Sequence, residues 1–286
     1  MLKVENLRKS FGGVLATDNV SIEFPRESLT AVIGPNGAGK TTFVNQLSGV
    51  IRPDRGRILF AGQDITTLRT LIRSGDYGPL DYLVSRFTCE NRTYGTWGAF
   101  RYEIADPLMV EGAVHHLDLL ADMAGGRCAT LYAQTWQPPW GQFRGDAQAL
   151  VTLQTEAGAR VLYEGAKTNA VGLNGWGAEY IRAECERATL ILSHGRIERF
   201  DYDPARRQPD RAEGTGVPVP LLEQPKWANT WLIEQFVRWL DGGPAMETEV
   251  EANLQSMALV FAAIESSRTG QPVDVQAFLN AARAQA

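Results

Sequence analysis

Apolar and polar positions follow two different patterns along this chain of 286 residues. In the first part, short apolar runs rich in β-branched residues predict strands over residues 1–11, 19–25 and 28–34. A helix closed by a glycine is predicted over 39–50, and 56–65 has the pattern of a strand, a turn and a second strand. This part therefore predicts a short α/β segment.

Beyond about residue 69 the chain consists of short strand-like runs with alternating apolar and polar positions. Short turns separate these runs, and the Thr-Glu-Ala-Gly-Ala segment at 155–159 suits a hairpin. We therefore predict a largely antiparallel sheet with one solvated or packed face. Its strands are expected over 80–90, 129–136, 146–155, 158–167, 179–186 and 188–200.

Two helices are predicted to end the chain, over 227–240 and 246–268. The stretch 201–220 is polar and rich in Pro and Gly, so we expect an exposed loop there. The change of pattern divides the chain into two predicted domains, residues 1–68 and residues 69–286.

Composition limits the classes of function. The formal net charge of −5 and the isoelectric point near 5.4 argue against a general nucleic-acid binder, which carries a basic face. Cys89, Cys128 and Cys185 lie far apart without metal-binding spacing, which favours reduced thiols in the cytoplasm. The first residues carry charges throughout, and no stretch approaches the ~18 apolar residues of a membrane-spanning helix. We therefore expect a soluble, cytoplasmic protein.

The most specific chemical motif is GPNGAGKTT at residues 34–42. Its spacing is that of a phosphate-binding loop, G-x-x-x-x-G-K-[ST], between a predicted strand and a predicted helix. The glycines let several backbone N–H groups point at phosphate oxygens; Lys40 would reach the terminal phosphates and Thr41 would coordinate Mg²⁺. The residues expected to bind ATP are Gly34, Asn36, Gly37, Gly39, Lys40, Thr41 and Thr42.

Residues 1–68 resemble the start of an ABC transporter ATPase, especially the type that serves branched-chain amino-acid uptake. The segments that carry the resemblance are LRKSFGGVLATDNVSIEF, GPNGAGKTT and LSGVIRPDRGRILFAGQDIT. It implies that adenine stacks on Phe11, whose alternative role is that of an ordinary core phenylalanine.

The other motifs of such ATPases do not follow in the sequence. We find no glutamine loop, no LSGGQ-type signature, no apolar run ending in Asp-Glu and no switch histidine. Phosphoryl transfer depends on positioning and charge neutralisation, so we expect nucleotide binding without hydrolysis and no productive coupling to a membrane permease. The apolar run 28–34 also lacks the neighbouring strands that a buried parallel strand requires, so residues 1–68 alone would be marginally stable.

Residues 69–282 resemble the C-terminal domain of the Gfo/Idh/MocA oxidoreductases, the group of glucose–fructose oxidoreductase and inositol dehydrogenase. The supporting segments include EGAVHHLDLL, ALVTLQTEAGARVLYEG and ECERATLILSHGRIERF. The resemblance implies an open sheet with helices on one side, which supplies substrate contacts and a homo-oligomer interface. The expected fold class is therefore α+β, a truncated P-loop α/β fragment followed by a mostly antiparallel open sheet.

The resemblance places a catalytic histidine at His115. Glu111 is four residues before it and Asp118 three residues after it, so on a helix the three can share one face. A carboxylate that orients an imidazole is a reasonable proton relay for a hydroxyl that loses hydride. The family often has Asp where Glu111 stands, and a purely structural His115–Glu111 pair is the alternative. His116 points about 100° away from His115, so the two do not form a natural chelate.

Several tryptophans are candidates for ligand contact or for packing. Trp136 and Trp140 are plausible walls for a sugar or polyol, and their alternative role is to anchor a Pro-rich loop. Trp227, Trp231 and Trp239 lie on a predicted helix and are expected to pack or form an interface. A dinucleotide-binding G-x-G-x-x-G turn and a Glu-Lys-Pro motif do not occur in the sequence, so NAD(P) would require another chain.

Three interpretations remain open. The chain binds MgATP through residues 34–42; or it is an oxidoreductase relative that has lost its cofactor domain; or it is a non-functional fusion of two genes, by rearrangement or assembly error. An abrupt join without a linker favours a chimera as the origin, because natural fusions join whole domains. ATP binding is the biochemical prediction, because all residues of that loop are present.

Overall fold

The computed structural model describes residues 2–24, 30–47, 51, 53–60, 63–205, 207, 209–223 and 228–284. The chain forms two compact units. The smaller unit comprises Met1–Gln63 with Leu222–Pro244, and the larger unit comprises Asp64–Leu221 with Ala245–Ala286. The predicted functional division at residue 68 stays a prediction, and residue 68 itself lies inside a helix of the larger unit.

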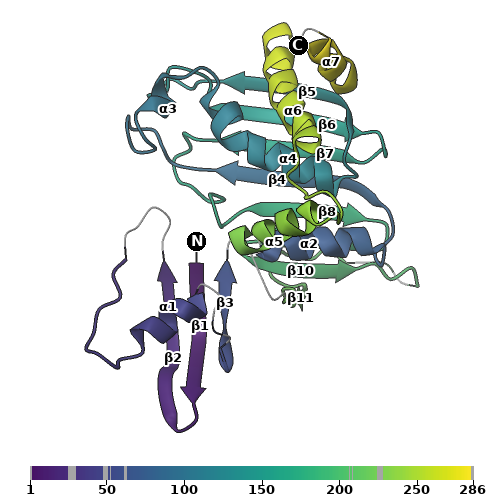
Figure 1. Cartoon of the computed structure of the whole chain (residues 1–286). Helices are drawn as coiled ribbons and strands as arrows, with labels where there is room; N and C mark the ends of the chain where they lie inside the picture. Colours follow the sequence, from purple (N-terminus) through teal and green to yellow (C-terminus); the bar gives the residue numbers. More distant parts are fainter. Residues whose placement is uncertain are drawn as a thin grey trace. The chain divides into compact units, whose positions relative to one another are not determined.

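The smaller unit contains a three-stranded antiparallel sheet in the order β2-β1-β3. Its strands are β1 (Leu2–Phe11), β2 (Val14–Phe24) and β3 (Arg55–Phe60), and its helices are α1 (Lys40–Leu47) and α5 (Ala228–Leu240). Figure 1 shows α1 lying against this sheet. The core here is small, consisting of Val4, Leu7 and Phe43 with a few partly buried neighbours. These elements confirm the predicted strands at the N-terminus and the helices expected over 39–50 and 227–240.

The strand expected over 28–34 is wrong for its described part, because residues 30–34 have no regular structure. Val32 is 39% exposed and Ile33 is 89% exposed. A strand that is apolar on both faces is stable only between neighbouring strands with helices over them, and no strand of the described residues pairs with 30–34. Residues 28 and 29, and Gly49 at the expected helix end, lie outside the described residues.

The second strand expected within 56–65 is also wrong, since helix α2 (Gln63–Ser74) begins there. Leu68 is fully buried, and Ile65, Leu71 and Ile72 pack on the same core. This spacing of three and four residues is helical, but it becomes visible only when the segment is extended beyond residue 65.

The larger unit is built on a nine-stranded sheet in the order β11-β10-β9-β8-β4-β7-β6-β5-β12. All adjacent strands are antiparallel except β4 and β7, which run parallel. The expected mostly antiparallel sheet is therefore confirmed. Its strands are β4 (Leu80–Thr88), β5 (Cys128–Trp136), β6 (Gln148–Thr155), β7 (Arg160–Ala166), β8 (Tyr180–Cys185), β9 (Ala188–Ser193), β10 (Arg196–Asp201), β11 (Val217–Val219) and β12 (Val273–Asp274).

The turn between β9 and β10 contains His194, which has a φ of 49°. Strand β11 lies within the stretch 201–220 that was expected to be only a loop, and it pairs with β10. Strands β11 and β12 contain only three and two residues, too few for an alternation pattern to show.

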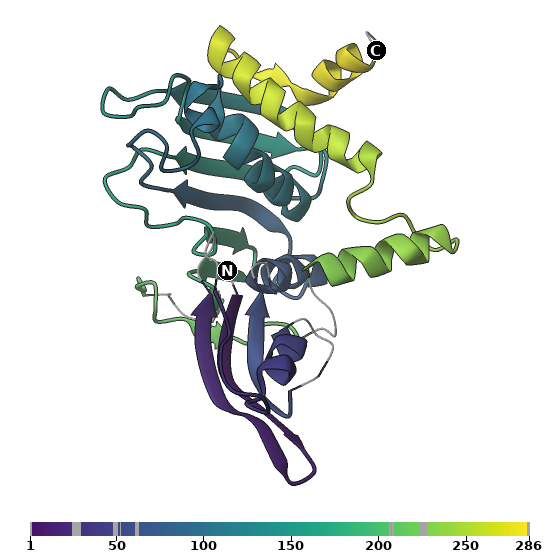
Figure 2. The same ribbon diagram turned by 60° about the vertical axis from the view of Figure 1, so that its left-hand side comes forward.

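Helices cover one face of the larger sheet. Helix α4 (Val114–Met123) follows a π-helical turn η1 (Met109–Ala113), and α6 (Val250–Thr269) packs beside α4. Figures 1 and 2 show α4 and α6 together across strands β4 to β7. Helix α3 (Phe100–Glu103) is a short turn in the loop after β4. Helices on one face confirm the expected fold class.

A further helix, α7 (Val275–Arg283), ends the described chain, so the expectation of two closing helices is wrong. Asp274 caps it by accepting a hydrogen bond of 2.9 Å from the backbone N–H of Ala277. The cap stands immediately before the helix in the sequence and was the signal that could have predicted it.

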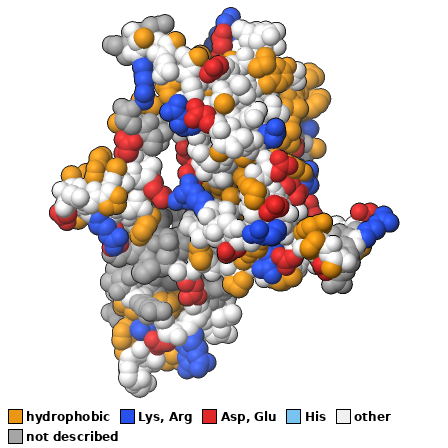
Figure 3. All heavy atoms as spheres, turned by 90° about the vertical axis from the view of Figure 1, so that its right-hand side faces the viewer, with side chains coloured by type: hydrophobic (Ala, Val, Ile, Leu, Met, Phe, Trp, Pro, Cys, Tyr) orange, Lys and Arg blue, Asp and Glu red, His pale blue; other side chains and the backbone are white. Residues whose placement is uncertain are grey.

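The surface carries charges of both signs in mixture. Figure 3 shows acidic and basic side chains interspersed on one face of the molecule. Exposed pairs such as Arg86–Glu164, with 3.6 Å between nitrogen and oxygen, contribute little to stability. Among the helices that the structure describes, none is long and apolar enough to cross a bilayer.

The two sides of helix α6 provide a stability test. Leu259 is fully buried, whereas Phe261 on the same helix is 47% exposed. Replacing Leu259 with Ala is expected to lower the free energy of unfolding of the larger unit by about 2–5 kcal/mol, because it leaves a cavity in a packed core. The control Phe261→Ala should cost about 0.5 kcal/mol or less in urea unfolding followed by circular dichroism. Equal losses in the two variants would contradict this packing.

Candidate functional site

The predicted phosphate loop lies between residues 30–33 and helix α1. Gly37 and Gly39 have φ values of 85° and 80°, which side chains rarely tolerate. A Cβ atom on Gly39 would lie 1.9 Å from the carbonyl oxygen of Ala16 in β2. Glycine is therefore required at residue 39, because the loop backbone packs directly on the neighbouring strand.

Lys40 begins helix α1 and folds back over the loop. Its Nζ donates hydrogen bonds to the carbonyl oxygens of Gly34, at 2.8 Å, and Pro35, at 2.7 Å. Residues 34–38 and Thr41 are exposed, while Thr42 is half-buried. An exposed glycine loop, a lysine over it and a helix N-terminus fit the phosphates of a nucleotide.

Phe11 ends strand β1 and is 49% exposed, with Lys9 Nζ 5.4 Å from its ring centroid. It is therefore not an ordinary core residue, and its contact with adenine stays a prediction. Among the described residues, no group of three His, Cys, Asp or Glu side chains could hold a metal ion. Thr41 would hold Mg²⁺ only together with nucleotide oxygens.

A second candidate site lies where the parallel strands β4 and β7 end at the same edge of the larger sheet. Phe87 is near the end of β4, and Lys167 directly follows β7. The turn η1 and the start of α4 lie over these ends and bring Glu111, His115 and His116 to them. We call the ring side chains gathered here the aromatic cluster: Phe87, Trp97, His116, Tyr163 and Trp176.

His116 is the buried member of the His115–His116 pair, at 5% exposed. Its ring centroid lies 4.3 Å from that of Phe87 and 5.1 Å from that of Trp176, and its Nδ1 is 3.3 Å from the Tyr163 hydroxyl. Burial, helped by the charges of Lys167 and His115, lowers the pKa of His116 to about 3. His116 is therefore neutral at physiological pH.

His115 is exposed on the same helix and meets Trp176 edge-on at 5.5 Å between centroids. Glu111 accepts a hydrogen bond of 3.0 Å from Arg101 Nε, and Asp118 accepts one from the hydroxyl of Ser256 on α6. The structure thus gives both carboxylates partners other than His115. The proton relay between Glu111 and His115 stays a prediction. It would require the Glu111 carboxylate to bind His115 as well as Arg101.

Trp136 and Trp140 are 41% and 56% exposed. The Nε1 of Trp140 donates a hydrogen bond of 2.9 Å to the carbonyl oxygen of Thr168, next to Lys167. The guanidinium of Arg92 lies 5.6 Å from the Trp140 ring centroid. Trp140 therefore stands beside the strand end that carries Lys167, with an exposed ring.

Sequence reasoning missed Lys167, Phe87, Trp97 and Trp176. Lys167 directly follows the buried strand β7, and a lysine at the end of a buried strand was the available signal. The tryptophans come from loops after β4 and β7, and only the parallel pairing of these strands brings the two loops together.

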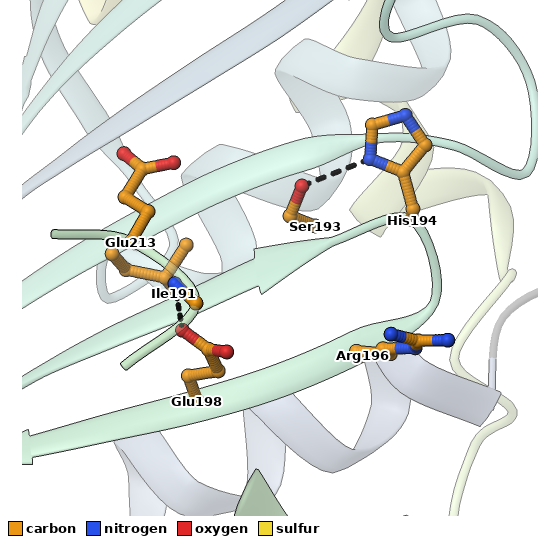
Figure 4. Close-up of a pocket in the computed structure, with 7 residues that line it drawn as sticks. Ile191, Ser193, His194, Arg196, Glu198 and Glu213 are labelled. Atoms are coloured by element: carbon orange, nitrogen blue, oxygen red, sulfur yellow. Dashed lines mark hydrogen bonds between the residues drawn. The ribbon is translucent and has the colours of Figure 1, made fainter. Parts of the chain in front are cut away.

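A separate hollow of about 430 Å³ lies on the β9–β10 hairpin, and none of the predicted site residues lines it. The Ser193 hydroxyl is 3.0 Å from Nδ1 of His194, and Glu198 accepts a 2.7 Å hydrogen bond from the backbone of Gly214. Figure 4 shows Glu198 and Glu213 across the hollow from His194. Neither Glu198 nor Glu213 is thus placed to orient the imidazole of His194.

Two protein families match different, overlapping parts of the chain. Residues 69–275 match the C-terminal alpha/beta domain of the oxidoreductase family, and the chain belongs to that family. Residues 17–91 match the ABC transporter family. One part of the chain thus matches the oxidoreductase family, and a shorter N-terminal part matches the ABC transporter family.

Individual relatives show the same two parts. The uncharacterised protein y4oX of Sinorhizobium fredii is 48% identical over 221 residues, which are 77% of this chain and 61% of y4oX. The chain thus spans about three-fifths of that relative. A probable branched-chain amino-acid transport ATP-binding protein LivG of Archaeoglobus fulgidus is 50% identical over 66 residues, 23% of this chain and 26% of LivG.

Solved structures share the fold of the larger unit. An oxidoreductase from Agrobacterium radiobacter, in complex with NAD+, L-tartaric acid and magnesium, is 20% identical with a TM-score of 0.59. The match covers 75% of this chain and 62% of that one. The WlbA dehydrogenase from Bordetella pertussis, in complex with NADH and UDP-GlcNAcA, is 17% identical with a TM-score of 0.55, covering 74% and 59%.

The buried neutral His116 gives a pH test. Because its pKa is about 3 when folded and 6.5 in the reference state, the unfolded chain binds an extra proton between these values. The contribution of neutral His116 to the stability of the fold is therefore complete above pH 6.5 and is lost as the pH falls towards 3. His116→Gln should reduce the slope of unfolding free energy against pH by about 1.4 kcal/mol per pH unit in this window.

His194→Gln, at an exposed turn, is the matched control for His116→Gln and should leave the slope unchanged. Urea unfolding at several pH values measures it. If both variants keep the slope of the natural protein, His116 is not held neutral by the aromatic cluster.

Proposed function

We propose that the chain binds a Mg-nucleotide through residues 34–42 without hydrolysing it. The observation that carries this proposal is the close packing of Gly39 on Ala16, which only glycine permits, with Lys40 folded over the same loop. Bound Mg²⁺ would neutralise phosphate charge, and Lys40 and Thr41 are the residues that would meet the phosphates and the metal. The absence of a water-orienting base from the sequence motifs argues against turnover.

Replacing Lys40 with Ala is expected to weaken MgATP binding on the order of tenfold or more, because the ammonium is the loop's only side-chain cation. Arg8→Ala, an exposed cation of the same unit, is the control and should bind as the natural protein does. Equilibrium dialysis with MgATP measures both. Identical retention by Lys40→Ala and the natural protein would remove the proposal, and steady phosphate release abolished by Lys40→Ala would contradict the absence of hydrolysis.

We infer a second function for the larger unit, the binding of a sugar or polyol as the substrate side of an oxidoreductase. It is favoured by exposed His115 and Trp140 beside the aromatic cluster. The ligands bound by the two structural relatives, tartaric acid and UDP-GlcNAcA, are polyhydroxylated.

The phosphate loop has triphosphate rather than dinucleotide spacing, so it does not fit NAD(P). A dinucleotide-binding domain would have to be supplied in addition to residues 1–286, and no dehydrogenation is expected without it. We also propose that the chain forms a homo-oligomer through the sheet face opposite the helices. On this face Leu150 and Leu162 are 46% and 44% exposed.

Replacing Trp140 with Ala is expected to weaken the binding of D-galactose about three- to tenfold, because an exposed ring no longer stacks on the sugar. The control is Tyr202→Ala, which removes an aromatic ring that directly follows β10 and is 57% exposed. Isothermal titration measures the affinities. Equal weakening in the two variants would argue against a ligand at Trp140, and a functionless fusion predicts no binding by any form.

A further inference from the structure

Lys167 is fully buried, which is rare for a lysine. Its Nζ lies 3.5 Å from the Trp97 ring centroid, 4.5 Å from that of Phe87 and 5.7 Å from that of Trp176. Among the described residues, this ammonium has no hydrogen-bond partner. Cation–π contacts offset part of its desolvation, but they supply no acceptor for its three N–H groups.

The turn η1 closes over this amine. A Cβ atom on Gly112 would lie 3.3 Å from both Cε and Nζ of Lys167, so only a glycine leaves the amine undisturbed there. The adjacent Glu111 forms its ion pair with Arg101, with 3.0 Å between nitrogen and oxygen. Arg101 itself lies 4.7 Å from the ring centroid of Trp97. Trp97 therefore has two cations over its ring, and one carboxylate stands near both of them.

Trp97 covers the amine from a short segment that begins and ends with glycine. Gly95 and Gly98 both have a φ of 85°, a conformation that suits glycine. Trp97 is half-buried, whereas Lys167 beneath it is fully buried. Of the rings around the amine, that of Trp97 is the nearest, so its movement would uncover the amine most directly.

We propose that Lys167 is the anion subsite of the larger unit and binds the carboxylate of a sugar acid when Trp97 moves aside. This inference rests on the second function proposed above. Lys167, Arg101 and Glu111 leave one net positive charge, which a single carboxylate neutralises. A phosphate dianion would leave a negative charge in a buried aromatic setting, which is costly.

The protonation of Lys167 limits this binding at high pH. Burial lowers the pKa of Lys167 to about 8; Arg101 acts in the same direction, and Cys89 and Glu111 oppose it. Burial raises the pKa of the Cys89 thiol, and His116 stays neutral, so neither introduces a charge near pH 8. The amine is half protonated at its pKa, so carboxylate binding is nearly complete at about pH 7 and falls about tenfold per pH unit well above pH 8.

The test compares D-galacturonate with D-galactose, which differ by a carboxylate in place of a hydroxymethyl group. The natural protein should bind galacturonate about tenfold or more tightly than galactose at pH 7 by isothermal titration. Lys167→Met, a neutral side chain of similar length, should abolish this preference. Arg160→Met removes an exposed cation from the same strand β7 and should keep the preference.

Equal affinities for the two sugars in the natural protein would overturn the subsite while leaving the polyol-binding function intact. If neither sugar binds the natural protein, both the function and the subsite fail. If Lys167→Met does not fold, the test is the galacturonate preference of the natural protein measured against pH. A galacturonate preference that falls above pH 8 supports Lys167, and one unchanged to pH 10 refutes it.

Discussion

The parallel pairing of β4 with β7 is the constraint on which the chemistry of the larger unit depends. In a sheet that is otherwise antiparallel, this one pairing carries the ends of two strands, and the loops that follow them, to the same edge. Phe87 and Lys167 thereby lie next to each other, and Trp97 and Trp176 arrive from the two loops. A register shift of one residue in β7 would turn Tyr163 out of the core and dismantle the aromatic cluster.

The two units differ in how completely they bury their apolar side chains. The larger unit has a continuous core in which Leu83, Leu117 and Leu259 are fully buried. In the smaller unit the buried core is small, and Ile33 beside the phosphate loop is almost entirely exposed. A nucleotide would therefore bind to a loop held mainly by its contact with β2 and by Phe43 of α1. Because so little packing supports the loop, we expect nucleotide binding by the smaller unit to be weak.

Local patterns predicted most of the elements, and long-range pairing explains where they failed. Alternation located β4 to β10 because each buries one face, and glycine spacing located the phosphate loop. The strand over 30–34 failed because its apolar residues need neighbours that the chain lacks, and α2 was missed because its helical period extends past residue 65. His115 was identified through a family resemblance, whereas the sequence signal for Lys167, a lysine directly after a buried strand, does not show which rings will surround it.

The most direct measurement of the central claim is a two-dimensional ¹H–¹⁵N spectrum of the tryptophan indole groups during addition of a sugar acid. The seven tryptophans provide probes in both units. If the carboxylate binds at Lys167, D-galacturonate should shift the indole signals of Trp97, Trp176 and Trp140. The signals of Trp231 and Trp239 on α5 should not move. Shifts confined to Trp231 and Trp239, or no shift at saturating ligand, would contradict a binding site at the ends of β4 and β7.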